Sequence, residues 1–251
     1  MNTLSQKHSA MNRENFDFVS SRIANRDCFN TLHRQVLKEF SVELSKLHVA
    51  SRDFQAEALN TLVTQVSLHL SKQTDLKVQF GDWMREPSFV NALSLNMVKM
   101  GTKKRWGDFD YATHPMLMAY NLNKSGASVQ TGILAVLHDL FEEQPQLNAL
   151  FEEDFIAQKV SINKIGEKLK ALIEPWDPYK QDEALVAAAR EEVFIPNRFQ
   201  ESYDRSIWYT LVYARFYQQF KSSDVSVLAV EITDRMEDVM DCEYLLQNPK
   251  Y

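Results

Sequence analysis

Four side chains with metal-ligand chemistry occur at separated places in the sequence: His114, the adjacent pair His138 and Asp139, and Asp234. The pair follows the apolar run LAVL, so we expect it in the protein interior, where unpaired polar groups are costly. A bound metal ion would offset that cost. Two imidazoles and two carboxylates suit Mn²⁺, Fe²⁺ or Zn²⁺ better than Ca²⁺, which prefers oxygen ligands. The sequence therefore predicts a mixed nitrogen and oxygen metal centre.

A centre of this kind could activate water. With four protein ligands, open positions could hold water and a substrate oxygen, and the metal would lower the pKa of the water and orient it for attack on phosphorus. Each ligand also has an ordinary structural explanation. His114 could cap its helix, Asp234 could pair with Arg235, and a His-Asp dipeptide often arises by chance.

The elements that must position these residues are predicted to be helices. Only 6 Gly and 7 Pro occur in 251 residues, and apolar residues recur at three- and four-residue steps, so we expect an all-α fold. His114 opens a helix with Pro115 at a tolerated first-turn position. The helices expected after residue 80 cover Ser88–Met100, Pro115–Lys124, Val129–Leu140, Ile162–Ile173, Asp182–Val193, Arg205–Phe220 and Asp224–Leu246.

The N-terminal third is predicted to be a helical hairpin from about Glu14 to Leu70, broken at Ser51–Asp53. We expect an extension over residues 1–80, a connection over Thr74–Pro87, and a main domain over residues 81–251. The hairpin could pack on the core or mediate homo-oligomerisation. Three histidines of this hairpin are interpreted as ordinary surface or half-buried residues rather than metal ligands: His33, His48 and His69.

Composition excludes several function classes. The formal net charge is −6 and the pI about 5.6, which argues against broad nucleic-acid binding through phosphate neutralisation. A local basic segment, Lys103-Lys104-Arg105, could still contact a phosphate or a base. Cys28 and Cys242 have no metal-type spacing, so a reducing cytoplasm is expected. No signal-peptide core and no apolar run of about 18 residues is present, so no membrane span is expected.

The order H…HD…D on helices is the HD-domain pattern, and the surrounding residues narrow it further. Arg105, Tyr111 and His114-Pro115 resemble the motif R-x-x-G-x-x-Y-x-x-H-P, with Gly107 one place early. The segment HDLFEE, residues 138–143, resembles HDxxED. Residues 227–236, VLAVEITDRM, resemble a stretch ending in K-x-A-D-R-L-x-N. Over roughly residues 89–246 the chain thus resembles the hydrolase domain of RelA/SpoT homologues, especially the small alarmone hydrolases.

This resemblance implies an HD-domain helical bundle that hydrolyses the 3′-pyrophosphate of (p)ppGpp with Mn²⁺, another divalent transition metal being an alternative. It implies that Glu142 and Glu143 handle the attacking water and its protons, in keeping with general acid–base catalysis. It also implies that Arg105 stacks on the purine base. Metal ligands implied in the same way are His114, His138, Asp139 and Asp234, and substrate contacts are expected from Lys104, Arg105, Tyr111, Asp238 and Asp241.

Departures from the pattern fall mainly on the substrate side. Trp106 replaces a lysine, Asp238 replaces an asparagine, Asp241 replaces a threonine, and Glu143 replaces an aspartate. An acidic residue facing the ribose or base would change selectivity. An HD nucleotidase, an NADPH phosphatase and a degenerate HD module that binds a nucleotide or a partner protein are therefore open alternatives.

Overall fold

The structure is a computed structural model and describes residues 24–49, 56–105, 109–162, 164–172 and 224–247. Of the described residues 79% are helical and none forms a strand, so the predicted all-α fold is confirmed. The helices expected at Asp182–Val193 and Arg205–Phe220 lie outside the described residues.

From α2 to α9, the helices follow one another in the sequence with short connections. Residues 24–39 form the first described helix. The labelled helices are α2 Ser41–His48, α3 Ala56–Leu70, α4 Thr74–Phe80, α5 Pro87–Met100, α6 Thr113–Lys124, α7 Val129–Leu137, α8 Glu153–Val160, α9 Ile165–Leu172 and α12 Val225–Gln247. The 3-10 turns are η1 Gly81–Arg85, η3 His138–Leu140 and η4 Pro145–Leu147.

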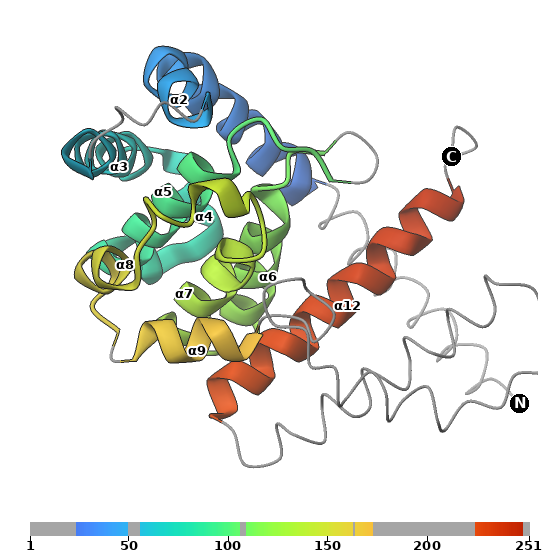
Figure 1. Cartoon of the computed structure of the whole chain (residues 1–251). Helices are drawn as coiled ribbons and strands as arrows, with labels where there is room; N and C mark the ends of the chain where they lie inside the picture. The colour runs from blue at the N-terminus through green and yellow to red at the C-terminus, as the bar shows by residue number, and fades with distance from the viewer. Residues whose placement is uncertain (1–23, 50–55, 106–108, 163, 173–223, 248–251) are drawn as a thin grey trace, which may run out of the picture.

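Helix α7 lies in the middle of the described bundle and packs against α5, α6, α9 and α12 (Figure 1). Its start is fixed by Ser128, whose hydroxyl accepts a hydrogen bond from the Thr131 backbone N–H at 3.2 Å. Every residue from Thr131 to Leu137 is buried. A side chain at position 132 would collide with the Trp83 ring, so Gly132 allows η1 to approach this helix closely.

The first 80 residues share one hydrophobic core with the rest of the described chain. The expected connection Thr74–Pro87 is instead mostly helical, because Leu76 and Phe80 are drawn into the core. The Phe80 ring stacks on Phe29 at 5.6 Å and meets the edge of Phe89 at 5.0 Å between ring centroids. The domain boundary predicted at residue 80 therefore falls within continuous packing, and a division there stays a prediction.

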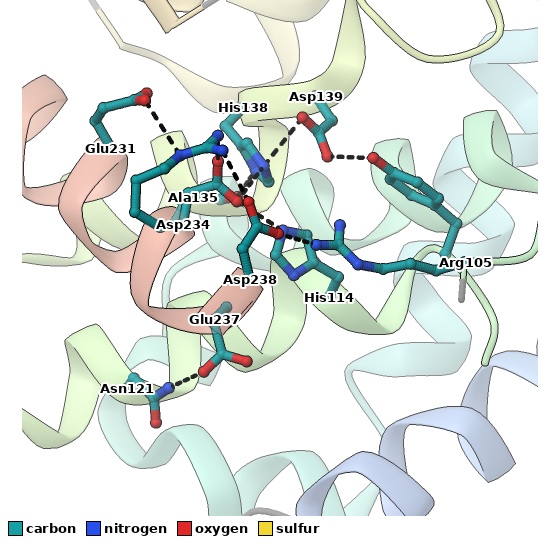
Figure 2. Close-up of polar contacts among 12 residues, drawn as sticks. Arg105, His114, Asn121, Ala135, His138, Asp139, Glu231, Asp234, Glu237 and Asp238 are labelled. Atoms are coloured by element: carbon teal, nitrogen blue, oxygen red, sulfur yellow. Dashed lines mark hydrogen bonds and ion pairs between the residues drawn. The ribbon is translucent and has the colours of Figure 1, made fainter. Parts of the chain in front are cut away.

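Helix α12 turns a different face inward from the one that its apolar residues indicated. Val225, Ile232 and Met236 are exposed, although their helical spacing places them together on one apolar side. The buried residues instead include the acidic Glu231, Asp234 and Glu237 as well as Val227 and Val230. Polar partners on neighbouring helices explain this orientation, since the Glu237 carboxylate accepts a hydrogen bond from Asn121 on α6 (Figure 2).

Within the described ranges, no helix is both long enough and apolar enough to cross a bilayer.

Candidate metal centre

Helices α6, α7 and α12 bring His114, His138 and Asp234 together (Figure 2). His114 lies in the first turn of α6, His138 begins η3 at the end of α7, and Asp234 lies within α12. One ligand atom from each residue lies within 4.8 Å of the other two. The Asp234 Oδ1 atom is 2.9 Å from His114 Nε2 and 3.6 Å from His138 Nε2. Residues separated by 120 positions in the sequence thus form one compact donor set.

Asp139, the fourth predicted ligand, lies beside this group rather than at its centre. Its Oδ1 atom is 3.0 Å from His138 Nε2, and its Oδ2 accepts a hydrogen bond from the Tyr111 hydroxyl at 2.8 Å. Tyr111 therefore acts on the centre by orienting this carboxylate. All four predicted ligands are buried, with at most 9% of any of them exposed.

The tautomer of His138 favours cation binding. Its Nδ1 donates a hydrogen bond to the Ala135 carbonyl at 2.8 Å, so the neutral ring carries its lone pair on Nε2. That nitrogen is buried, accepts no hydrogen bond from the described residues, and faces the carboxylates of Asp139 and Asp234. A lone pair facing two negative charges requires a cation, either a proton or a metal ion. Imidazole nitrogen with carboxylate oxygen is also a donor set that suits divalent transition metals.

The pKa values of His138, Asp139 and Asp234 also show that positive charge is stabilised at this group. Burial alone would lower the pKa of His138, but Asp139 and Asp234 raise it well above its ordinary value. Burial would raise the pKa of Asp234, yet His114 and His138 hold it well below its ordinary value. The pKa of Asp139 falls to about 2 against the same effect of burial, chiefly because of His138. In the metal-free protein a proton on His138 therefore provides the positive charge between the carboxylates.

A chain of ion pairs extends from the centre to the basic segment. Arg235 contacts both Asp234 and Asp238, and Arg105 contacts the other oxygen of Asp238 (Figure 2). The Arg105 guanidinium also lies 5.7 Å from the centroid of the Tyr111 ring. Arg105, Tyr111 and Asp238, three of the predicted substrate contacts, thus lie together beside the donor set. Trp106 lies outside the described residues, as does the side chain of Asp241.

The basic segment places its neighbouring lysines on opposite sides. Lys104 pairs with the buried carboxylate of Asp110, away from the donor set. Lys103, which belongs to the basic segment but is not among the substrate contacts implied by the resemblance, pairs with Glu143. Glu142 and Glu143 directly follow η3 and are half-buried. Of the two lysines, Lys103 is therefore the one that contacts a predicted catalytic residue.

The backbone that carries the two glutamates is held by residues that sequence reasoning missed. The Lys99 ammonium is fully buried and donates hydrogen bonds to the Leu140 carbonyl and the Asn148 side chain. Gln144 has a φ of 53°, an uncommon conformation for a residue other than glycine. Its amide donates to the Lys99 and Met100 carbonyls at 2.7 and 2.8 Å, which satisfies the end of α5. A lysine within the apolar run MVKM was the available signal for this scaffold.

The predicted non-ligand histidines have other partners. His48 donates to the Val98 carbonyl at 3.0 Å, and His69 lies 2.8 Å from Glu39. His33 is fully buried, with Nδ1 3.7 Å from Asp110. None of them joins a metal-type cluster within the described ranges.

Comparison with known proteins adds no relative: no protein-family model, no curated protein and no solved structure matches this chain.

Proposed function

We propose that this chain is a metal-dependent phosphohydrolase, acting in the cytoplasm on (p)ppGpp or a related purine alarmone and releasing its 3′-pyrophosphate. One observation carries the proposal. The lone pair of His138 Nε2 is buried against two carboxylates, with His114 completing a donor set from three helices. Unpaired buried groups of this kind are costly without a cation, and they are characteristic of functional sites.

The proposed ligands are His114, His138, Asp139 and Asp234, and Mn²⁺ is the proposed ion. A divalent ion here would supply Lewis acidity toward a water molecule and a phosphoryl oxygen. Tyr111 orients Asp139 through its hydroxyl, and the Ala135 carbonyl fixes the tautomer of His138. Glu142 and Glu143, which directly follow η3, are the residues proposed to accept and return a proton.

A second substrate class is favoured by the contact between Arg105 and Asp238. A guanidinium engaged by a carboxylate must break this contact or share it before it can stack on a base. A nucleotidase or a phosphatase of a dinucleotide such as NADPH would need no such stacking. This alternative keeps the same metal centre and changes only what is bound beside it.

The test is incubation of the purified chain and Mn²⁺ with ppGpp, ppApp and NADPH, with products separated into pyrophosphate and orthophosphate. We expect pyrophosphate from an alarmone, and a loss of at least about 100-fold in rate for His138→Ala, because the metal loses a ligand. His69→Ala, which removes a histidine paired with Glu39, is the matched control and should retain the rate.

Two results would overturn the proposal. One is pyrophosphate release that survives both a chelator and the His138→Ala change. The other is no phosphate release from any of the three compounds by a protein shown to contain the metal. Asp139→Asn serves as a second variant if circular dichroism shows that His138→Ala is unfolded.

A further inference from the structure

Two cations close to the candidate metal centre lie on one side of a short extended pairing. The Arg105 N–H donates to the Phe109 carbonyl and the Tyr111 N–H to the Lys103 carbonyl, both at 2.9 Å. Side chains alternate between the two sides of such a segment. Lys104 therefore points toward Asp110, whereas Lys103 and Arg105 point together toward Tyr111.

These two cations share one aromatic ring. The Lys103 Nζ atom lies 4.8 Å from the centroid of the Tyr111 ring, and the Arg105 Cζ atom lies 5.7 Å from the same centroid. The hydroxyl of that ring donates to Asp139 at 2.8 Å. The positive groups are thus one side chain away from the donor set, and Tyr111 fixes their position relative to it.

Each cation is paired with a carboxylate outside the predicted ligand set. Lys103 contacts Glu143, and Arg105 contacts Asp238. The exposed side-chain fractions are 34% for Lys103 and 21% for Glu143 in one pair, and 13% for Arg105 and 29% for Asp238 in the other. Ion pairs that solvent reaches contribute little to stability. A phosphate, which binds Arg through two parallel hydrogen bonds and Lys as a point charge, can replace both carboxylates.

We propose that Lys103 and Arg105 form a phosphate-binding subsite in which substrate phosphoryl oxygens replace Glu143 and Asp238 as partners. The inference rests on the proposed phosphohydrolase function and identifies the side of the centre where the phosphate chain lies. Occupancy of the subsite releases Glu143, which then becomes available for proton transfer. Lys103 therefore couples the presence of substrate to the state of a catalytic carboxylate.

The probe is inorganic pyrophosphate, titrated by calorimetry into the full chain with and without Mn²⁺. We expect Lys103→Gln to raise the Kd for pyrophosphate about tenfold, which corresponds to about 1.4 kcal/mol. Lys72→Gln removes an exposed positive charge elsewhere and should leave the Kd unchanged. The affinity for Mn²⁺ should change less than twofold in both variants, because neither lysine is a ligand.

Glu143 variants separate direct contact from an indirect effect. Lys103→Gln leaves Glu143 without this partner, and that carboxylate could itself repel the anion. We therefore expect Glu143→Gln alone to tighten pyrophosphate binding severalfold, because Lys103 no longer has to leave a carboxylate. In the Glu143→Gln background, Lys103→Gln should still weaken binding about tenfold.

Wild-type affinity in Lys103→Gln, or a larger loss in Lys104→Gln, would overturn the subsite. So would disappearance of the Lys103→Gln effect in the Glu143→Gln background. A different result would show that the proposed function is wrong while the subsite exists. Pyrophosphate would then bind in a Lys103-dependent manner, but no nucleotide would be hydrolysed. Hydrolysis with a Kd indifferent to Lys103 would leave the function intact and remove the subsite.

Discussion

Lys99 supports the backbone segment that follows His138 and Asp139 in the candidate metal centre. Its ammonium is fully buried, lies 5.3 Å from the centroid of the Phe151 ring, and donates to the Leu140 carbonyl just before Glu142 and Glu143. Burial lowers the pKa of Lys99 from 10.5 to about 7. The fold therefore accepts an electrostatic cost in order to fix the backbone at this position.

This cost predicts a pH dependence of stability. The unfolded chain keeps the Lys99 proton up to a pKa of 10.5, whereas the folded chain releases it near 7, so the folded state binds fewer protons in between. The free energy of unfolding should rise with pH in this window, relative to Lys99→Met, by about 1.4 kcal/mol per pH unit, and level off below pH 7. Urea unfolding at several pH values measures the difference. Lys72→Met should run parallel to wild type, and a parallel Lys99→Met curve would contradict the prediction.

Among the elements, the basic segment depends most on distant support. Asp110 lies opposite Lys104 in the extended pairing and is 1% exposed. Its carboxylate contacts Lys104 and, at 3.3 Å, the Arg34 Nε atom, while its N–H donates to Asn30. The helix of residues 24–39 thus holds the segment that presents Lys103 and Arg105. Asn30, 80 positions before Asp110 in the sequence, thus helps to hold the backbone beside the predicted substrate-binding residues.

Asp110→Asn should lower the free energy of unfolding by about 2 kcal/mol, because a buried carboxylate that accepts hydrogen bonds from two cations becomes a neutral amide. Burial alone would raise the pKa of Asp110, but His33 and Lys104 bring it down from 3.8 to about 2. Its stabilisation is therefore present above pH 3.8 and is lost as the pH falls toward 2, so the two proteins should converge there. Asp82→Asn breaks a well-exposed pair with Arg85 and should cost less than about 0.5 kcal/mol. Equal losses in urea unfolding would refute this role of Asp110.

Sequence reasoning predicted the donor set but not its surroundings. His114, His138 and Asp234 stood out because polar ligand types interrupt apolar helical runs. The pairing of Lys103 with Glu143, and of Lys104 with Asp110, could not be predicted, because it depends on how residues 103–105 pair with 109–111. The apolar spacing of α12 does not give its buried face for a similar reason, since a contact from α6 favours burial of the acidic side.

For the molecule as a whole, the N-terminal helices belong to the same packing unit as the centre. One core cluster of the described residues includes members from Phe29 to Val230, and Phe80 contacts the rings of both Phe29 and Phe89. The helices of the first 80 residues cover α5, which in turn packs against α7. These helices therefore belong to the packing that surrounds the candidate metal centre.

A chain that begins at residue 81 should lack cooperative thermal unfolding and a near-ultraviolet circular dichroism signal, because the inner face of α5 loses its cover. In the full chain, Phe80→Ala should lower the free energy of unfolding by about 3 to 5 kcal/mol and Phe80→Leu by clearly less. A fragment that unfolds cooperatively near the full-length midpoint would contradict the shared core. It would support a division at residue 80 instead.

The left-handed conformation of Gln144 also bears on the order of folding. The local backbone disfavours this conformation, and the bonds that compensate reach carbonyls 45 and 44 residues away. Loop closure over such distances becomes favourable only after α5 is in place. The turn after Glu143 should therefore be absent from the folding transition state, and changes at Gln144 should accelerate unfolding without slowing folding. The backbone that follows Glu142 and Glu143 would then reach its final conformation in one of the last steps of folding.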